Sequence, residues 1–289
     1  MTDTPWYAKN YREMLKYKGR ILPLAHTQAQ LDYSNRNVHR DTDHLHPSEL
    51  AKRDWCPRAA WYKIKKYPAT AESSSFSRLN VFEEGHGIHH KWQTWLWKAG
   101  VLSGNWKCKN CNHVFTGVAP SSCSACGDSN IHYAEVPIYS EEYKLIGHAD
   151  GEVVDKEGKA LIEIKSVGLG TVRWEHPSLH KAYSDGLLSL DSLWNNIKKP
   201  FVSHIRQGQI YMHFTGHDEI VFIYEWKPSQ EVKEFRVKYQ EDIVQPILDN
   251  CKLVIKHLDN DTLPDTPVWA ESINSSGCKF CPYKKECWK

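Results

Sequence analysis

The chain is 289 residues long, with 40% hydrophobic and 25% charged residues and a formal net charge of +2. This length excludes a mini-protein and predicts one sizeable core with a small appended or inserted module. No apolar run approaches the roughly 18 residues that a membrane helix needs, so we expect no membrane partner. Because the net charge is small, any site for a polyanion must be a local patch.

The N-terminal residues indicate a compartment. Residues 1–6 contain no basic segment followed by an apolar one, which argues against a secretory signal and a disulfide-forming environment. We therefore predict a protein of the reducing cytoplasm, either bacterial or, for a viral protein, that of the host.

The first elements predicted along the chain are an irregular arm and two helices. Residues 33–45 are polar and lack periodicity, which predicts a loop. A helix is predicted to start within residues 46–50, with Ser48 as its N-cap, and to continue through Tyr62. A second helix is predicted over about residues 81–97. A spacing of four places three residues on one face of this helix: Gly85, His89 and Gln93.

The middle of the chain is predicted to form a small sheet. Residues 133–139, 143–154 and 160–167 are rich in strand-forming residues and are separated by turn residues. Residues 168–200 mix Gly, Pro, His and Ser with short apolar pieces, which predicts a long, partly ordered excursion over the site. A helix is predicted to follow over residues 201–214.

The last elements predicted are two strands and a helix. The strands cover residues 219–226 and 231–238, and the helix covers about residues 239–258, where Pro246 is expected to introduce a kink. Five residues would share the apolar face of this helix: Ile243, Ile247, Cys251, Val254 and Leu258.

Four of the nine cysteines form a zinc-ribbon pattern. Two Cys-x2-Cys pairs lie inside a short stretch that is rich in Asn, Ser and Gly. Each pair can place two sulfurs about 2.3 Å from one tetrahedral Zn²⁺, and the metal supplies stability that so short a segment cannot get from a core. Free buried thiols would not show this spacing twice, and an iron centre is the alternative. We predict structural zinc on Cys108, Cys111, Cys123 and Cys126.

A second group of cysteines lies at the C-terminal end. Cys278, Cys281 and Cys287 need a fourth ligand, and Cys56 is available. Four thiolates with mixed spacing can ligate a [4Fe-4S] cluster, which would clamp the N-terminal helix to the end of the chain. Zinc on the same four sulfurs is the alternative. The remaining cysteine, Cys251, falls on the apolar face of the last helix and is predicted to be a core residue.

Two acidic residues and a lysine are predicted to converge at the sheet. Glu163 and Lys165 point to the same face of a strand, and Asp150 on the neighbouring strand can reach them. Two carboxylates hold a hard cation such as Mg²⁺ or Mn²⁺, and the backbone carbonyl of Ile164 can add a ligand. The cation can polarise a phosphate and activate water, while Lys165 orients that water or stabilises the developing charge. An edge ion pair is the alternative for Glu-Ile-Lys taken alone.

Five motifs occur in a fixed order: Cys56-Pro57 together with the three C-terminal cysteines, Gly85 to His89, Gly147 to Asp150, Glu163 to Lys165, and Gln207 to Tyr211. Over roughly residues 48–289, apart from the ribbon, the chain thereby resembles the PD-(D/E)XK superfamily, in particular the RecB-type nucleases that include the CRISPR-associated iron-sulfur exonucleases. The resemblance implies that His89 ligates the catalytic metal and that Gln207 and Tyr211 line the active-site wall. It also implies an iron-sulfur cluster on four cysteines: Cys56, Cys278, Cys281 and Cys287.

The resemblance further implies an α/β fold of the restriction-endonuclease type, with helices flanking a mixed central sheet. We expect four parts: an N-terminal arm with helices over residues 1–104, the zinc-ribbon insertion over 105–132, the nuclease core over 133–240, and the C-terminal helix with the iron-sulfur segment over 241–289. The implied activity is metal-dependent hydrolysis of DNA by an exonuclease that acts on single strands or ends in recombination, repair or phage DNA metabolism. No helicase P-loop is present in the sequence, so a helicase, recombinase or other DNA-processing partner would supply any unwinding.

The ribbon departs from the family pattern and has two interpretations. Lys107, Lys109 and His113 lie beside Trp106 and Phe115, which predicts a surface that grips single-stranded DNA near the mouth of the cleft. Alternatively, these aromatic residues pack over the metal site and the ribbon docks a protein. Two other functions compete with the enzyme: a nucleic-acid-binding module with a degenerate acidic site, and a nuclease subunit that is competent only inside a larger complex.

Overall fold

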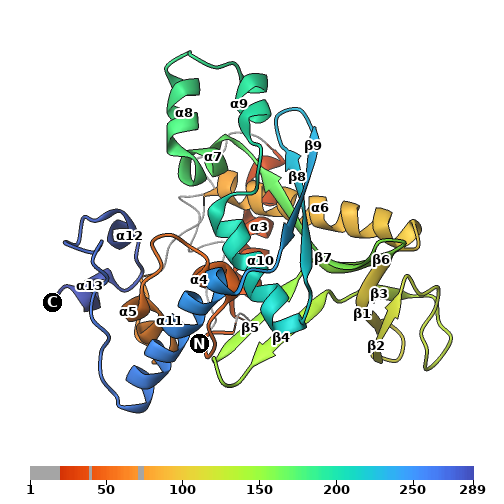
Figure 1. Ribbon diagram of the computed structural model, residues 1–289, viewed down its shortest axis with the longest axis horizontal. Helices are drawn as coiled ribbons and strands as arrows, with labels where there is room; N and C mark the ends of the chain where they lie inside the picture. The colour runs from red at the N-terminus through yellow and green to blue at the C-terminus, as the bar shows by residue number, and fades with distance from the viewer. Residues whose placement is uncertain (1–19, 39–40, 71–74) are drawn as a thin grey trace.

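A seven-stranded mixed sheet forms the centre of the computed structural model, which describes residues 20–38, 41–70 and 75–289 (Figure 1). Residues 1–6, on which the prediction of a cytoplasmic compartment depends, are not among the described residues. The strand order is β2-β1-β6-β7-β8-β9, and β3 also pairs with β1. The bounds are β1 Leu102–Cys108, β2 Val114–Val118, β3 Ile131–Tyr133, β6 Gly151–Asp155, β7 Gly158–Val167, β8 Glu219–Trp226 and β9 Val232–Lys238. A separate hairpin consists of β4 (Val136–Ser140) and β5 (Leu145–Ala149).

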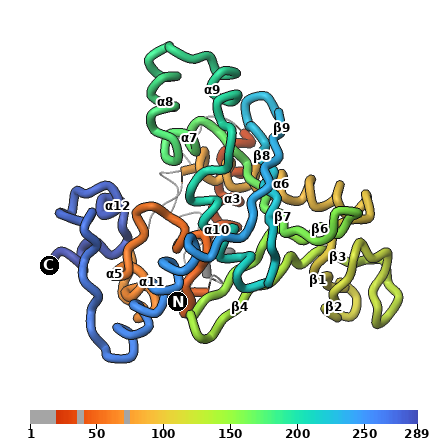
Figure 2. Tube along the Cα trace, viewed as in Figure 1, coloured from red at the N-terminus to blue at the C-terminus, as the bar shows by residue number. Residues whose placement is uncertain are grey.

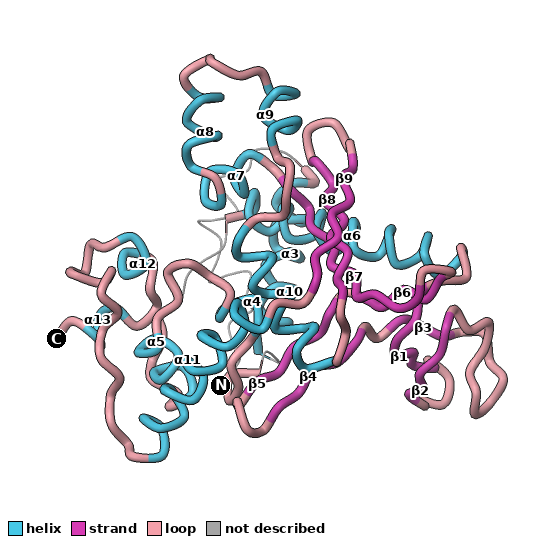
Figure 3. The backbone as a smooth tube through the Cα atoms, in the orientation of Figure 1, coloured by secondary structure: helices cyan, strands magenta, loops and turns pink. Residues whose placement is uncertain are grey.

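One parallel pair of strands makes the sheet mixed. β7 runs parallel to β8, with Leu161 opposite Ile220, whereas the flanking ladders β6–β7 and β8–β9 are antiparallel. Parallel neighbours need a long crossover connection, which helices supply here (Figure 3). The helices of this crossover are α7 (Leu169–Glu175), α8 (Pro177–Ser184), α9 (Leu190–Asn196) and α10 (Val202–Thr215).

Helices cover both faces of the sheet. On β7, Ile162 and Ile164 share a buried cluster with Ile88 of α6 (Phe76–Lys98). Leu161 and Val167 belong instead to the core that contains the buried residues of α10. The alternation follows from the two-residue repeat of a strand. The predicted fold class, a mixed central sheet flanked by helices, is confirmed.

The C-terminal segment returns to the N-terminal helices, as the trace in Figure 2 shows. Arg58 Nε donates to the carbonyl of Pro264 at 2.8 Å, and the backbone N–H of Thr70 donates to Pro282 at 2.9 Å. The remaining helices are α3 Leu22–Val38, α4 Pro47–Leu50, α5 Pro57–Ile64, α11 Glu241–Asp259, α12 Ser276–Lys279 and α13 Lys284–Cys287. Within the described ranges, none of the helices combines the length and the apolar character needed to span a membrane.

The helical boundaries near the N-terminus differ from the prediction. The single helix predicted from Ser48 is two short helices, α4 and α5, and the N-cap of α4 is His46. The break lies before Pro57, where Cys56 is extended with φ −126° and ψ 118°, as a residue before proline prefers. Part of the loop predicted over residues 33–45 is also helical, because α3 continues to Val38; residues 39–40 lie outside the described chain.

Two predicted strands are each divided in the structure. Residues 133–139 separate into β3 and β4 around Glu135, whose φ is +62°, and residues 143–154 separate into β5 and β6 at Asp150. The excursion predicted over residues 168–200 is helical rather than partly ordered. Three buried side chains on α7 and α9 anchor it to the core: Val172, Leu193 and Trp194.

The longer predicted elements agree with the structure. The helices predicted over residues 81–97 and 201–214 are α6 and α10, and the strand predicted over residues 219–226 is β8. The last predicted helix is α11, which continues through Pro246.

Candidate active site and cysteine centres

A chain of hydrogen bonds joins the predicted catalytic residues of β7 and α10. Lys165 Nζ donates to Glu163 Oε1 at 2.6 Å and to Gln207 Oε1 at 3.1 Å. Gln207 Nε2 in turn donates to the hydroxyl of Tyr211 at 2.7 Å, one helical turn farther along α10. Glu163 is only 2% exposed, and Gln207 and Tyr211 are also buried. The structure therefore brings the residues of two separately predicted motifs into one polar cluster, in which only Lys165 is half-buried rather than buried.

Asp150 connects this cluster to α6. It lies at the junction of β5 and β6, where Oδ2 accepts a hydrogen bond from the backbone N–H of Ile164 at 2.6 Å. Its Oδ1 lies 3.1 Å from His89 Nδ1. Gln93, one turn after His89, donates to the backbone carbonyl of Asp150 at 2.9 Å. The predicted face of α6 thus contacts the predicted acidic residue.

Burial and charge together set the protonation of this site. Burial raises the pKa of Glu163, and the neighbouring charge of Asp150 adds to the shift. Burial works against the charge of Lys165, but Glu163 and Asp150 outweigh it and raise the pKa of this lysine. Burial likewise opposes protonation of His89, but the hydrogen bond to Asp150 and its charge raise the pKa of this histidine. The carboxylates therefore give the site a negative potential, which attracts a cation or a proton.

Three side chains are placed to hold a metal ion. His89, Glu135 and Asp150 each offer one ligand atom, and these atoms all lie within 4.8 Å of one another. Glu163 is not a member of this group, but its Oε2 is buried and has no hydrogen-bond partner among the described residues. A histidine with several carboxylate oxygens fits Mg²⁺ or Mn²⁺.

Sequence reasoning did not identify Glu135. It lies in the middle of a segment that the residue pattern assigned to one continuous strand. A lone acidic residue among strand-forming residues gives little indication of a ligand, so the sequence carried no usable signal for Glu135.

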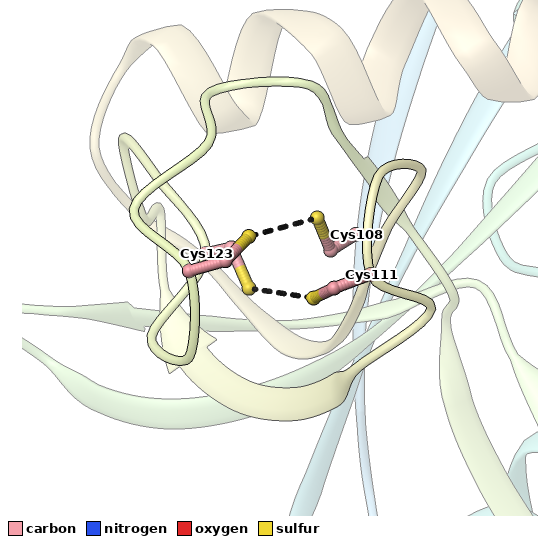
Figure 4. A group of neighbouring side chains, drawn as sticks. Cys108, Cys111 and Cys123 are labelled. Carbon is pink, nitrogen blue, oxygen red and sulfur yellow. Dashed lines mark hydrogen bonds between the residues drawn. The ribbon is translucent and has the colours of Figure 1, made fainter.

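The four ribbon cysteines have the geometry of a zinc site (Figure 4). Cys108 Sγ lies 3.6 Å from Cys126 Sγ, and Cys111 Sγ lies 3.7 Å from Cys123 Sγ. The four sulfurs all lie within 4.8 Å of one another. A tetrahedron with metal–sulfur bonds of about 2.3 Å has sulfur–sulfur edges of about 3.8 Å. The site therefore fits a single tetrahedral ion.

The groups proposed to grip DNA on the ribbon do not all face solvent. Trp106 is 1% exposed, packs against Trp97 and Tyr133, and donates from Nε1 to the carbonyl of Gly117 at 3.0 Å. Trp106 is therefore a core residue rather than a surface for base stacking. Lys109 and His113 are exposed, as a surface role requires.

The second cysteine group is more widely spaced. Although all four cysteines belong to the described chain, no three of their sulfurs lie within 4.8 Å of one another. They are nevertheless neighbours: burial raises the pKa of Cys56, and the charges of Cys281 and Cys287 add to the shift. Arg58 Nη1 donates to Cys287 Sγ at 3.7 Å. By contrast, Cys251 is buried in the core of α11, as predicted, and burial raises the pKa of this thiol to about 12.

The comparisons with known proteins add distant structural neighbours. No family model and no curated protein matches this chain. The crystal structure of SSO0001 is similar with a TM-score of 0.45 and 14% identity, and the match covers 94% of this chain and 98% of that one. The alkaline exonuclease LHK-Exo from Laribacter hongkongensis is similar with a TM-score of 0.40, 14% identity and coverage of 76% and 90%. Its complex with dAMP has a TM-score of 0.38, 13% identity and the same coverage. All three similarities lie below a TM-score of 0.5 and at 13–14% identity.

Proposed function

We propose that the protein is a metal-dependent deoxyribonuclease of the PD-(D/E)XK type, acting as an exonuclease on single strands or DNA ends. One observation carries this proposal: residues from four separate segments meet in a single, partly buried cluster. The segments are α6, the junction of β5 and β6, strand β7, and helix α10, and the residues are His89, Asp150, Glu163, Lys165, Gln207 and Tyr211.

The proposed cation is Mg²⁺ or Mn²⁺. His89, Asp150 and Glu163 would hold it with the backbone carbonyl of Ile164. The Oε2 atom of Glu163, which has no hydrogen-bond partner among the described residues, supports this assignment. When bound, such an ion polarises the phosphate and stabilises the charge that develops during phosphodiester hydrolysis.

The protein's own groups position the phosphate and balance its charge. Lys165 is held between Glu163 and Gln207, so its ammonium group has a fixed place beside the carboxylates. A fixed positive charge stabilises developing negative charge without reorganisation during the reaction. Tyr211 fixes Gln207 from the other side, which keeps the Gln207 oxygen directed at Lys165.

The two cysteine groups are proposed to hold different cofactors. The close spacing of the ribbon sulfurs supports structural Zn²⁺. The wider spacing of Cys56, Cys278, Cys281 and Cys287 suits a [4Fe-4S] cluster, in which each thiolate binds a different iron, better than a single zinc ion. We also propose that the protein acts in the cytoplasm and that it works with another DNA-processing protein.

A cleavage assay tests the proposed activity. Purified protein is mixed with end-labelled single-stranded DNA, duplex DNA and RNA, with and without Mn²⁺. We expect metal-dependent release of short products from DNA, and loss of cleavage in D150N, E163Q and K165M. The matched control is E142Q, because Glu142 is an exposed carboxylate in the turn between β4 and β5. Binding of DNA without cleavage would instead support a binding module, and full activity of D150N would exclude the assigned site.

A further inference from the structure

Glu135 occupies an unusual backbone position next to the site. Its φ of +62° is in the left-handed region, which non-glycine residues rarely adopt and which is common where function requires strain. Two backbone hydrogen bonds to β1 hold this position. The N–H of Asn105 donates to the carbonyl of Glu135 at 3.1 Å, and the N–H of Ala134 donates to the carbonyl of Asn105 at 2.7 Å.

The strained backbone brings a second carboxylate to Asp150. The ligand atoms of Glu135, Asp150 and His89 lie within 4.8 Å of one another, and Glu135 is half-buried. Two carboxylates at this distance repel each other unless a cation or a proton lies between them. Within the described part of the chain, no lysine or arginine forms an ion pair with Glu135, and Lys165 pairs with Glu163 instead.

An independent observation points to the same ligand. Glu163 approaches from β7, its side chain is 3% exposed, and its Oε2 has no partner among the described residues. A buried carboxylate oxygen without a hydrogen bond is costly, and a bound cation would satisfy it. One oxygen of Glu163 therefore lacks a partner even though Lys165 pairs with the other, and Glu135 lies beside Asp150, so the site presents carboxylate oxygens that a cation would bind.

We infer that Glu135 is a further ligand for the divalent cation, in addition to the residues of the sequence motifs. This inference rests on the proposed nuclease site. It also gives the stem of the zinc ribbon a role in the site, because β1 extends from Leu102 to the zinc ligand Cys108 and holds Glu135 through Asn105. Strand β3 pairs with β1, and the Tyr133 hydroxyl donates to the carbonyl of Ser103 at 2.7 Å.

Calorimetric titration with Mn²⁺ tests this inference on the full-length protein. We expect E135Q to bind Mn²⁺ at least tenfold more weakly than the wild type, and E142Q to bind it normally. Without metal, E135Q should melt at the same temperature as the wild type or higher, because the substitution removes a repulsive charge beside Asp150. E135D keeps the charge but shortens the side chain, and it should weaken Mn²⁺ binding at least threefold. If E135Q does not fold, the Mn²⁺ affinity of E135D tests whether Glu135 is a ligand.

The variant D150N separates the two possible failures. Normal Mn²⁺ affinity in E135Q and E135D, together with loss of binding in D150N, would overturn the role of Glu135 and leave the nuclease site in place. If D150N also binds normally, or if the wild type binds no Mn²⁺, the metal site itself is wrong and the assignment of Glu135 is wrong with it.

Discussion

The two groups of four cysteines differ in how far apart their members lie, both along the chain and in space. The ribbon cysteines fall within residues 108–126, and their four sulfurs lie within 4.8 Å of one another. The cysteines of the second group fall between residues 56 and 287, and no three of their sulfurs lie that close, although the structure describes all four.

Different contacts shape the two sites. Each ribbon knuckle is closed by a local backbone hydrogen bond, from Cys108 to His113 at 2.9 Å and from Cys123 to Asp128 at 2.8 Å. The second group depends on packing between α5 and the C-terminal segment, where the rings of Tyr62 and Tyr283 stack with centroids 5.8 Å apart. A metal in the ribbon would therefore stabilise one module, whereas a cluster in the second group would link the N-terminal helices to the C-terminal segment.

The largest effect is expected from C281A. Losing the cluster removes a cross-link between residues 56 and 281, which by loop-closure entropy is worth about 5 kcal/mol of unfolding free energy. Anaerobically purified wild-type protein should be brown and contain both iron and zinc, while C281A should be colourless and contain only zinc. Urea denaturation followed by fluorescence measures the loss of stability. A colourless wild-type protein that binds only zinc under strictly anaerobic conditions would refute the cluster assignment.

A smaller and more local effect is expected from C111S. The ribbon loop is short, so the same reasoning gives about 3 kcal/mol, confined to the ribbon. Zinc content should fall while iron content stays unchanged. Hydrogen exchange should rise over residues 109–130 and stay low in β7. Faster exchange throughout the central sheet would show instead that the ribbon is part of the global folding unit.

Much of the fold could be predicted because the longer elements carry a complete pattern. β8 is an almost continuous apolar run and is buried along nearly its whole length, so its predicted bounds match the structure. Helices α7 and α9 have only seven residues each, too few to display a periodic face, and they depend on a few buried side chains. The sequence therefore could not show that these two segments are helical.

The residues of the candidate site also fall into those that the sequence could predict and one that it could not. Glu163 and Lys165 could be placed on one face because a strand fixes the direction of alternate side chains. Glu135 could not be placed, because its position depends on a positive φ and on hydrogen bonds to Asn105, which is distant in sequence. Motifs within one element were therefore predictable, whereas a ligand at a break between strands was not.

An intermediate effect is expected from R58M, which tests the contacts around the second group. Arg58 donates to the carbonyl of Pro264 at 2.8 Å and to Cys287 Sγ at 3.7 Å. Methionine keeps much of the apolar stem but removes both hydrogen bonds, at a cost of about 2 kcal/mol. The brown colour should also fade faster in air than in the exposed control R53M. Equal fading rates in the two variants would mean that Arg58 does not protect the cluster.

The smallest effect is expected from C251A, which removes the one cysteine assigned to neither group. Cys251 is fully buried on α11 within the apolar core, where burial raises the pKa of its thiol to about 12. Removing one buried heavy atom leaves a small cavity worth about 1 kcal/mol, visible as a slightly lower urea midpoint. Iron and zinc contents should both equal those of the wild type, because each proposed centre has four other cysteines as ligands. A loss of either metal in C251A would mean that this thiol is a ligand and that one of the two cysteine groups is wrongly composed.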